Sequence, residues 1–137
     1  MITKQISVFV ENTKGRLAEI TNILASNNIN ICALSIADTT NFGILRIIVN
    51  DPDLAEKALR DRGFTVSITS VITLNLADKP GELAKALAIL AENDIEVEYI
   101  YAYITKEDSD AHIVLRIERD IEAVEILRNA GYDCVKS

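Results

Sequence analysis

The sequence is short of the residues that several classes of partner and location require. Its 137 residues include no Trp, two Pro and five Gly, and 14 Lys and Arg stand against 21 Asp and Glu. The resulting net charge of −7 repels phosphate backbones and anionic lipids on average, so we expect no nucleic-acid and no membrane partner. No apolar run approaches the roughly 18 residues that a bilayer span needs, and the first residues lack a secretory-signal pattern. We expect a cytoplasmic protein.

The sequence also lacks the side-chain clusters that catalysis and metal binding require. Cys32 and Cys134 have no CxxC spacing and no histidine cluster near them, so we expect buried thiols in a reducing compartment. His112 is the single histidine, with no second ligand at metal-binding spacing, and we expect an exposed or half-buried imidazole. No GxSxG, HExxH or glycine-rich phosphate loop is present. We predict that the protein is not an enzyme and that it uses no metal or cofactor.

The chain contains an internal repeat. Residues 11–31 (ENTKGRLAEITNILASNNINI) align with residues 77–97 (ADKPGELAKALAILAENDIEV), so that Gly15 matches Gly81 and Ile29 matches Ile95 at a constant offset of 66 positions. Farther along, the arginines at 46 and 116 and the glycines at 63 and 131 also match, with slightly larger offsets. A repeat of this length indicates one supersecondary unit that occurs twice.

Each copy has the hydrophobic pattern of a βαββαβ module. Residues 4–10 alternate polar and apolar as a strand does, whereas apolar residues recur at helical spacing after Gly15, beginning with Leu17. The predicted elements of copy one cover 4–10, 15–26, 30–37, 43–49, 51–63 and 64–68, and those of copy two cover 70–77, 81–93, 96–105, 111–118, 120–130 and 132–136. The fold class is therefore α+β, with two tandem ferredoxin-like modules at 1–68 and 69–137, each with an antiparallel sheet and helices on one face.

Both copies keep a tight loop between the first strand and the first helix. It reads Asn12-Thr13-Lys14-Gly15-Arg16-Leu17 in copy one and Asp78-Lys79-Pro80-Gly81-Glu82-Leu83 in copy two. The glycine lets backbone approach a ligand closely, and the first N–H groups of the helix favour an anion such as a carboxylate. The Asn or Asp side chain can accept a hydrogen bond from an ammonium, so one loop could hold both ends of an amino acid. The alternative is purely structural, because Asn, Asp and Pro are also common where helices begin.

The loop pattern, inside a βαββαβ unit and followed by Asn-Ile-Asn-Ile or Asp-Ile-Glu-Val, resembles the ACT domain, and two copies cover the whole chain. The resemblance implies an amino acid bound between paired modules, with Asn12 and Asp78 in polar contact, Gly15 and Gly81 allowing close approach, and Leu17 and Leu83 packing beneath. Serine-binding members use a polar residue at the start of strand two, which corresponds to Asn30 and Glu96. They also carry a histidine where this chain has Val10 and Leu76, so the pocket is expected to be tuned differently.

Copy two carries an aromatic row on its second strand. Tyr99, Tyr101 and Tyr103 alternate with smaller or aliphatic residues, so their rings share one face. Two hypotheses remain for Tyr99 and Tyr101: they flank the side chain of a bound ligand, or they cover a seam between modules.

These observations lead to a prediction of function. We expect a non-enzymatic, allosteric regulatory protein that binds a free amino acid between modules, forms a homodimer and modulates an enzyme of amino-acid metabolism. One alternative is a ligand-free interaction module that partners an enzyme. Another is an acylphosphatase-like enzyme, for which Arg16 is the one loop candidate and Glu82 its mismatched counterpart. If the loops bind the ligand, Gly15→Val or Gly81→Val is expected to weaken binding with little loss of fold.

Overall fold

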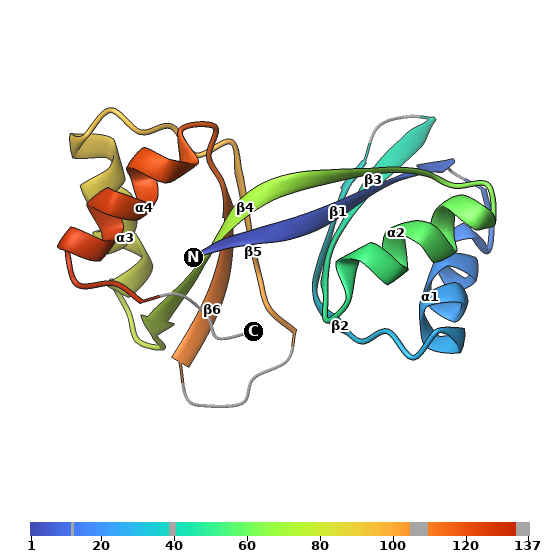
Figure 1. The fold of residues 1–137 in the computed structure, drawn as a ribbon. Helices are drawn as coiled ribbons and strands as arrows, with labels where there is room; N and C mark the ends of the chain where they lie inside the picture. The colour runs from blue at the N-terminus through green and yellow to red at the C-terminus, as the bar shows by residue number, and fades with distance from the viewer. Residues whose placement is uncertain (12, 39–40, 105–109, 134–137) are drawn as a thin grey trace. The chain divides into compact units, whose positions relative to one another are not determined.

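The computed structural model describes residues 1–11, 13–38, 41–104 and 110–133 (Figure 1). Helices and strands follow one another in the order that the repeat predicts, and the α+β class is confirmed. The elements in chain order are β1 (Ile2–Glu11), α1 (Arg16–Ser26), β2 (Ile31–Asp38), β3 (Phe42–Val49), α2 (Pro52–Asp61), β4 (Thr65–Ala77), α3 (Glu82–Glu92), β5 (Tyr99–Ala102), β6 (Asp110–Arg116) and α4 (Asp120–Asn129).

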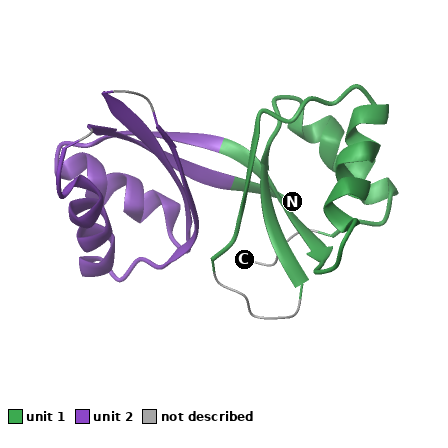
Figure 2. Ribbon diagram, turned by 180° about the vertical axis from the view of Figure 1, so that it is seen from behind, with its two compact units in different colours: residues 1–3, 70–137 green, residues 4–69 purple. Residues whose placement is uncertain are grey.

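The chain divides into two compact units, shown in purple and green in Figure 2. The N-terminal unit comprises Lys4–Thr69, and the C-terminal unit comprises Met1–Thr3 together with Ser70–Ser137. The first three residues join the C-terminal unit because the start of β1 lies beside β4. There the Thr73 N–H donates to the Met1 carbonyl oxygen at 2.8 Å, and the Thr3 and Thr73 hydroxyls are 3.2 Å apart.

Hydrogen-bonded neighbours follow the order β2-β3-β1-β4-β6-β5. In the N-terminal unit β3 pairs antiparallel with both β1 and β2, and in the C-terminal unit β6 pairs antiparallel with both β4 and β5. The two helices of each unit cover one face of its strands (Figure 1). β2 and β5 are edge strands, so one side of each has no strand neighbour among the described residues.

Each unit has its own apolar core, built by the periodicities seen in the sequence. In the N-terminal unit, Ile6 and Val8 of β1 are fully buried beneath Ile20 and Leu24 of α1. In the C-terminal unit, Leu90 of α3 and its strand neighbours repeat that arrangement. The N-terminal core residues are Ile6, Val8, Val10, Ile20, Ile23, Leu24, Ile29, Leu45, Ile47, Val49, Ala55, Leu59, Phe64 and Val66.

Four expectations need adjustment. β4 runs unbroken from Thr65 to Ala77, where two strands were predicted, because no Gly or Pro interrupts this stretch. β5 is shorter than the predicted 96–105, since the acidic approach through Glu96 and Glu98 has low strand propensity. Cys32 is half-buried rather than buried because it lies on an edge strand. The predicted strand 132–136 is described only to Asp133, which forms a single bridge with Asn75, and Cys134 lies outside the described residues.

Candidate functional site

The glycine loop has a defined backbone in the N-terminal unit. The Thr13 N–H donates to the Glu11 carbonyl oxygen at 2.7 Å, the Arg16 N–H to Thr13 at 3.4 Å, and the Glu19 N–H to Gly15 at 3.0 Å. Gly15 precedes the first residue of α1 with φ of 86°, in the left-handed region that L side chains rarely adopt. Glycine is therefore required by the turn itself, whatever the loop binds.

The same loop recurs in the C-terminal unit with nearly identical hydrogen bonds. The Lys79 N–H donates to Ala77 at 3.0 Å, the Glu82 N–H to Lys79 at 3.4 Å, and the Lys85 N–H to Gly81 at 3.0 Å. Gly81 has φ of 89°. The internal repeat therefore preserves the backbone of this turn as well as its sequence.

The first turn of α1 offers backbone N–H groups to a ligand. Gly15 has no side chain to cap the helix. Within the described ranges, we find no acceptor for the N–H groups of Leu17 and Ala18. Together with the helix dipole, two such donors make a local site for an anion.

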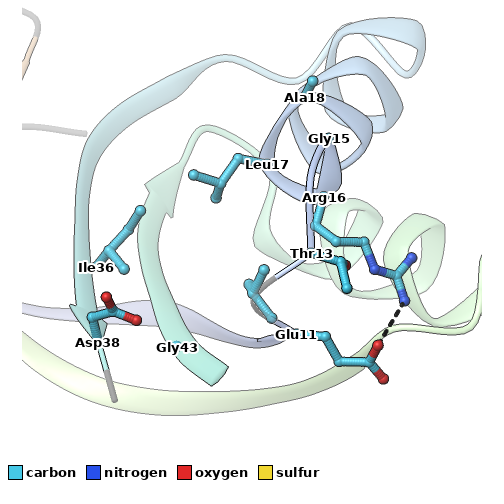
Figure 3. A pocket seen from close by; sticks show the side chains of 10 residues that line it. Glu11, Thr13, Gly15, Arg16, Leu17, Ala18, Ile36, Asp38 and Gly43 are labelled. Carbon is cyan, nitrogen blue, oxygen red and sulfur yellow. Dashed lines mark ion pairs between the residues drawn. The ribbon is translucent and has the colours of Figure 1, made fainter. Parts of the chain in front are cut away.

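A pocket of about 420 Å³ lies beside this turn, within the N-terminal unit (Figure 3). Its volume falls in the range of roughly 300–1,000 Å³ that is typical of small-molecule sites. Loop and helix residues form one side, and the β2–β3 hairpin forms the other. The lining residues are Val10, Glu11, Thr13, Gly15, Arg16, Leu17, Ala18, Ile36, Asp38 and Gly43.

Strand register explains why space remains here. Val10 of β1 lies opposite Gly43 of β3, and Gly43 lies opposite Asp38 of β2, so the three residues form one row across the sheet. The side chains of directly opposed residues project from the same face of the sheet, and Gly43 has no side chain on that face. A Cβ added to Gly43 would lie 3.3 Å from the Ala37 carbonyl oxygen and 3.6 Å from the nearer Asp38 carboxylate oxygen. Because Gly43 has no side chain, its backbone forms the floor of the pocket.

Charges are unevenly distributed around the pocket. The Arg16 guanidinium contacts Glu19 at 3.0 Å and Glu11 at 4.0 Å, and it lies 5.1 Å from the centre of the Phe64 ring. These contacts neutralise part of the Arg16 charge beside the pocket. The exposed Asp38 carboxylate lies at the hairpin, across Gly43 from the helix N-terminus (Figure 3). The pocket thus has donors at one end and a carboxylate at the other.

The predicted loop residues of copy one fall into three groups. Thr13, Gly15, Arg16 and Leu17 line the pocket. Lys14 is exposed and does not line it. Asn12, predicted to contact the ligand, lies outside the described residues.

The packing role that the resemblance implies for Leu17 stays a prediction, and the structure places this residue in the lining of the pocket. Its side chain is 43% exposed and faces the pocket near Ile36 (Figure 3), because the core positions of α1 begin one turn later at Ile20. Leu83 of the C-terminal unit is 38% exposed, and its implied packing role also stays a prediction.

Asn30 is not brought to the loop within its unit. It follows the C-terminal end of α1, whereas Gly15 precedes the first residue, so an 11-residue helix of about 16 Å separates them. The Asn30 N–H instead donates to the Asn50 side-chain oxygen at 2.9 Å, and the Asn50 N–H donates back to the Asn30 carbonyl oxygen at 3.2 Å. Glu96 occupies the equivalent position of the second copy and is exposed there.

The second copy differs from the first at the residues around its glycine turn. Asp78, Lys79, Pro80 and Gly81 are exposed around its turn. Glu82 replaces Arg16 and lies 3.9 Å from Lys79 and 3.8 Å from Lys85.

The floor of the pocket also differs in the second copy. Ala111 lies opposite Leu76, as Gly43 lies opposite Val10, so a methyl group stands where copy one has none. The strand register places Ala102 at the position of Ile36, and Ile104 therefore replaces Asp38. The donor turn is kept, but the carboxylate and the open floor are not.

The aromatic row lies on one face of the C-terminal unit. The Tyr99 and Tyr101 rings are stacked, with centres 6.5 Å apart, and Tyr103 meets the half-buried His112 edge-on at 5.7 Å. The register pairs Tyr101 with the buried Val114, opposite the face that the helices cover. The shared face of the rings is confirmed, and a ligand role for Tyr99 and Tyr101 stays a prediction.

The structure changes one expectation about the glycine turns and adds residues to the site that the sequence did not predict. The expectation that Gly15→Val or Gly81→Val causes little loss of fold needs adjustment, because both glycines have left-handed φ angles that strain a β-branched residue. Sequence reasoning also missed Asp38, Ile36 and Gly43. They reach the loop because β3 pairs antiparallel with β1 and so returns the β2–β3 hairpin to it, a pairing that no local pattern specifies.

Other kinds of site are not found in the described part of the chain. Across these residues, no group of three or more His, Cys, Asp or Glu side chains is arranged to hold a metal ion. None of the described helices combines the length and apolar character needed to cross a bilayer.

Comparisons with known proteins agree with this architecture. Residues 1–136 match the family model of the ACT domain pair. The crystal structure of protein BT0572 from Bacteroides thetaiotaomicron is similar, with 42% identity, a TM-score of 0.92 and coverage of 98% of this chain and 92% of that chain. The ligand-free regulatory subunit of aspartate kinase from Thermus thermophilus shares the fold at 17% identity and a TM-score of 0.65, covering 96% and 95% of the two chains. The regulatory subunit of aspartate kinase from Thermus flavus also shares the fold, with 18% identity, a TM-score of 0.60 and coverage of 95% of each chain. The comparison with curated proteins gives no match. Because the family model spans residues 1–136, the chain belongs to the ACT domain pair family.

Proposed function

We propose that this chain is a regulatory module that binds a free α-amino acid in the pocket of its N-terminal unit. The observation that carries the proposal is the row Val10–Gly43–Asp38, which leaves an open floor between the helix N-terminus and a carboxylate. An α-amino acid carries its ammonium and its carboxylate on the same carbon atom, and the lining of this pocket includes groups suited to each of them. The proposal uses residues of one unit, and a site between modules stays a prediction.

The helix end is suited to the carboxylate of the ligand. Leu17 and Ala18 line the pocket, and an anion bound by their N–H groups would satisfy both donors and interact favourably with the dipole of α1. Arg16 adds positive charge nearby, reduced by its contacts with Glu11 and Glu19. The ligand carboxylate therefore depends mainly on backbone groups, which side-chain substitution leaves in place.

Asp38 is suited to the ligand ammonium. A carboxylate accepts charge-assisted hydrogen bonds, and Asp38 lines the pocket across Gly43 from the helix end. The remaining lining is largely aliphatic and comes from Val10, Leu17 and Ile36. We therefore infer that the preferred ligand has an aliphatic side chain, with no charge of its own to be buried.

Only the N-terminal unit is proposed to bind. The C-terminal unit has Ile104 in place of Asp38, Ala111 in place of Gly43 and Glu82 in place of Arg16. Each replacement works against a zwitterion, since the ammonium loses its acceptor, the floor gains a methyl group and the carboxylate meets a like charge. A stoichiometry of one ligand per chain follows.

Regulation would follow from differential binding. A ligand that favours one arrangement of the modules shifts the population by no more than its difference in affinity for the two arrangements. Membership of the ACT domain pair family and the fold shared with regulatory subunits of aspartate kinase support this role. An enzyme of amino-acid metabolism as the target stays a prediction.

Ligand binding is tested first by thermal unfolding of the purified chain with each of the twenty amino acids at millimolar concentration. A ligand that binds only the folded state raises the midpoint as RT ln(1 + [L]/Kd). We expect an aliphatic amino acid to raise it, and titration calorimetry to give one site per chain. If no amino acid shifts the midpoint, the ligand-free interaction module is favoured. Two equal sites would contradict the distinction between the repeats.

Asp38→Asn is expected to weaken binding of that amino acid about tenfold, the loss expected for one solvent-exposed charge-assisted hydrogen bond. The same ligand without its amino group should bind the wild type and Asp38→Asn with equal affinity. Asp61→Asn serves as the control, because Asp61 is an exposed carboxylate of the same unit that pairs with Lys57 away from the pocket. If the amino-free ligand is also weakened by Asp38→Asn, Asp38 does not contact the ammonium.

A further inference from the structure

The first strand of the chain belongs to both compact units. Residues Met1–Thr3, the N-terminal segment, are part of the C-terminal unit, where Met1 packs against the apolar core (Figure 2). From Lys4 onward the strand is part of the N-terminal unit, and Ile6–Glu11 pair with β3 there. No Gly or Pro interrupts β1 between its two ends. One continuous strand therefore contributes to two separate cores.

The internal repeat indicates that the N-terminal segment is additional to the first module. The repeat offset of 66 positions matches Lys4 with Ser70, and each is the residue at which the chain passes from one unit into the other. The same offset would match the N-terminal segment with residues 67–69, which lie in the N-terminal unit. The segment therefore serves the C-terminal unit rather than the module that it precedes.

Thr73 of β4 holds the N-terminal segment in place. Its N–H donates to the Met1 carbonyl oxygen at 2.8 Å, and its hydroxyl donates to the same oxygen at 3.3 Å. The Thr3 hydroxyl lies 3.2 Å from the Thr73 hydroxyl. Because Thr73 is only 1% exposed, its polar groups rely on these partners rather than on water. Attachment of the segment therefore completes the interior of the C-terminal unit.

We propose that β1 couples the amino-acid pocket to the C-terminal unit, so that a ligand in the pocket strengthens attachment of the N-terminal segment to β4. The ligand part rests on the proposed function, because Val10 and Glu11 at the other end of β1 line the pocket. A ligand that contacts this end favours the ordered strand. An ordered strand has less conformational freedom to lose when its first three residues attach.

The second strand shared by the units is a less direct route. β4 also contributes to both cores, with Val66 in the N-terminal one and Ile72 in the C-terminal one. Among the described residues that line the pocket, however, none comes from β4, whereas two come from β1. The attached segment also has an effect at the surface, since Met1 and Ile2 line a groove beside α4. A change at the pocket would thus alter a surface of the other unit.

Hydrogen exchange of the Thr73 amide in the full chain measures attachment of the segment directly. Without any ligand, Ile20→Val, which shortens a fully buried side chain of the N-terminal core, is expected to speed this exchange about two- to tenfold. Amides around Leu90 in α3 should keep their rates. Unchanged exchange at Thr73 overturns the coupling whether or not the chain binds an amino acid. Equal acceleration at Leu90 also overturns it, because the whole chain would then open as one unit.

The ligand provides the second part of the test. A saturating amino acid is expected to slow exchange at Thr73 at least about fivefold, the lower end of typical couplings between sites. Thr3→Asp should detach the segment, because a carboxylate is costly to bury beside Thr73, and fast exchange at Thr73 checks this. By linkage, this variant should raise the Kd by the same factor. Thr65→Asp is the control, since Thr65 is an exposed residue at the other end of β4.

The outcomes separate this coupling from the proposed function. An amino acid that binds without slowing exchange at Thr73 overturns the coupling and leaves the proposed function in place. Equal affinity of detached Thr3→Asp and the wild type does the same. If no amino acid binds, the proposed function fails, and the ligand-free exchange of Ile20→Val decides whether β1 couples the two units.

Discussion

Gly43→Val is expected to weaken amino-acid binding on the order of 100-fold, while the chain keeps its fold. Valine would place three carbon atoms on the floor between Val10 and Asp38, in the space assigned to the ligand. Forcing a ligand into a site filled by added methyl groups costs about 1–3 kcal/mol, and lost contacts with the displaced ligand add to this. Gly43 has no left-handed φ, and valine is favoured in strands.

The stability change from this substitution should be small. The added Cβ lies 3.3 Å from the Ala37 carbonyl oxygen, which must move by a few tenths of an ångström. We expect a change below about 1 kcal/mol in the free energy of unfolding, which is the span of strand propensities. Titration calorimetry measures the affinity, and urea denaturation measures the stability.

Ala111→Val is the matched control, since Ala111 occupies the equivalent place in the other repeat. It is expected to leave affinity and stoichiometry unchanged. Equal affinity of Gly43→Val and the wild type would remove the pocket from the proposed function. Loss of binding in Ala111→Val alone would move the site to the C-terminal unit.

Gly15→Val is expected to lower the free energy of unfolding by about 2 kcal/mol. A left-handed conformation costs a residue with a Cβ about 1–2 kcal/mol, and β-branching places valine at or above the upper end. Steric contact is not the cause, because a Cβ added to Gly15 meets nothing within 4 Å. The penalty comes from the backbone conformation alone.

Gly15→Asn separates the two causes, because asparagine tolerates the left-handed region better than other residues with a Cβ. It is expected to cost less than about half of the valine penalty, as measured by urea denaturation. Gly81→Val and Gly81→Asn should show the same ranking, since Gly81 has φ of 89°. If valine and asparagine destabilise equally, the left-handed angle is not what requires glycine here.

The sequence predicted the fold well because the fold depends on short-range pattern. Alternation at Ile6, Val8 and Val10 and helical spacing at Ile20 and Leu24 follow from the period of each element, and all five side chains are buried in the structure. The match of Gly15 with Gly81 predicted the two modules, and the two loops have the same hydrogen bonds. Such patterns act within one element or one turn, so a single sequence reveals them.

The candidate site could be predicted only in part. Gly15, Thr13, Arg16 and Leu17 are adjacent in sequence to the turn that presents them, and they line the pocket. Asp38 and Gly43 come more than twenty residues later and reach the pocket only through strand register, which a local pattern does not specify. The exposure of Leu17 also depended on where α1 crosses the sheet.

The sequence by itself determined that this protein has two βαββαβ modules and that each has a glycine turn before its first helix, because periodicity and backbone conformation are local properties. Tertiary structure placed a pocket beside the glycine turn of the N-terminal unit. Pairing of β3 with β1 and β2 placed Gly43, which has no side chain, between Val10 and Asp38. The same register in the second copy placed Ala111 at that position. Register decides which distant residues share a face, and it is set by the packing of the whole sheet.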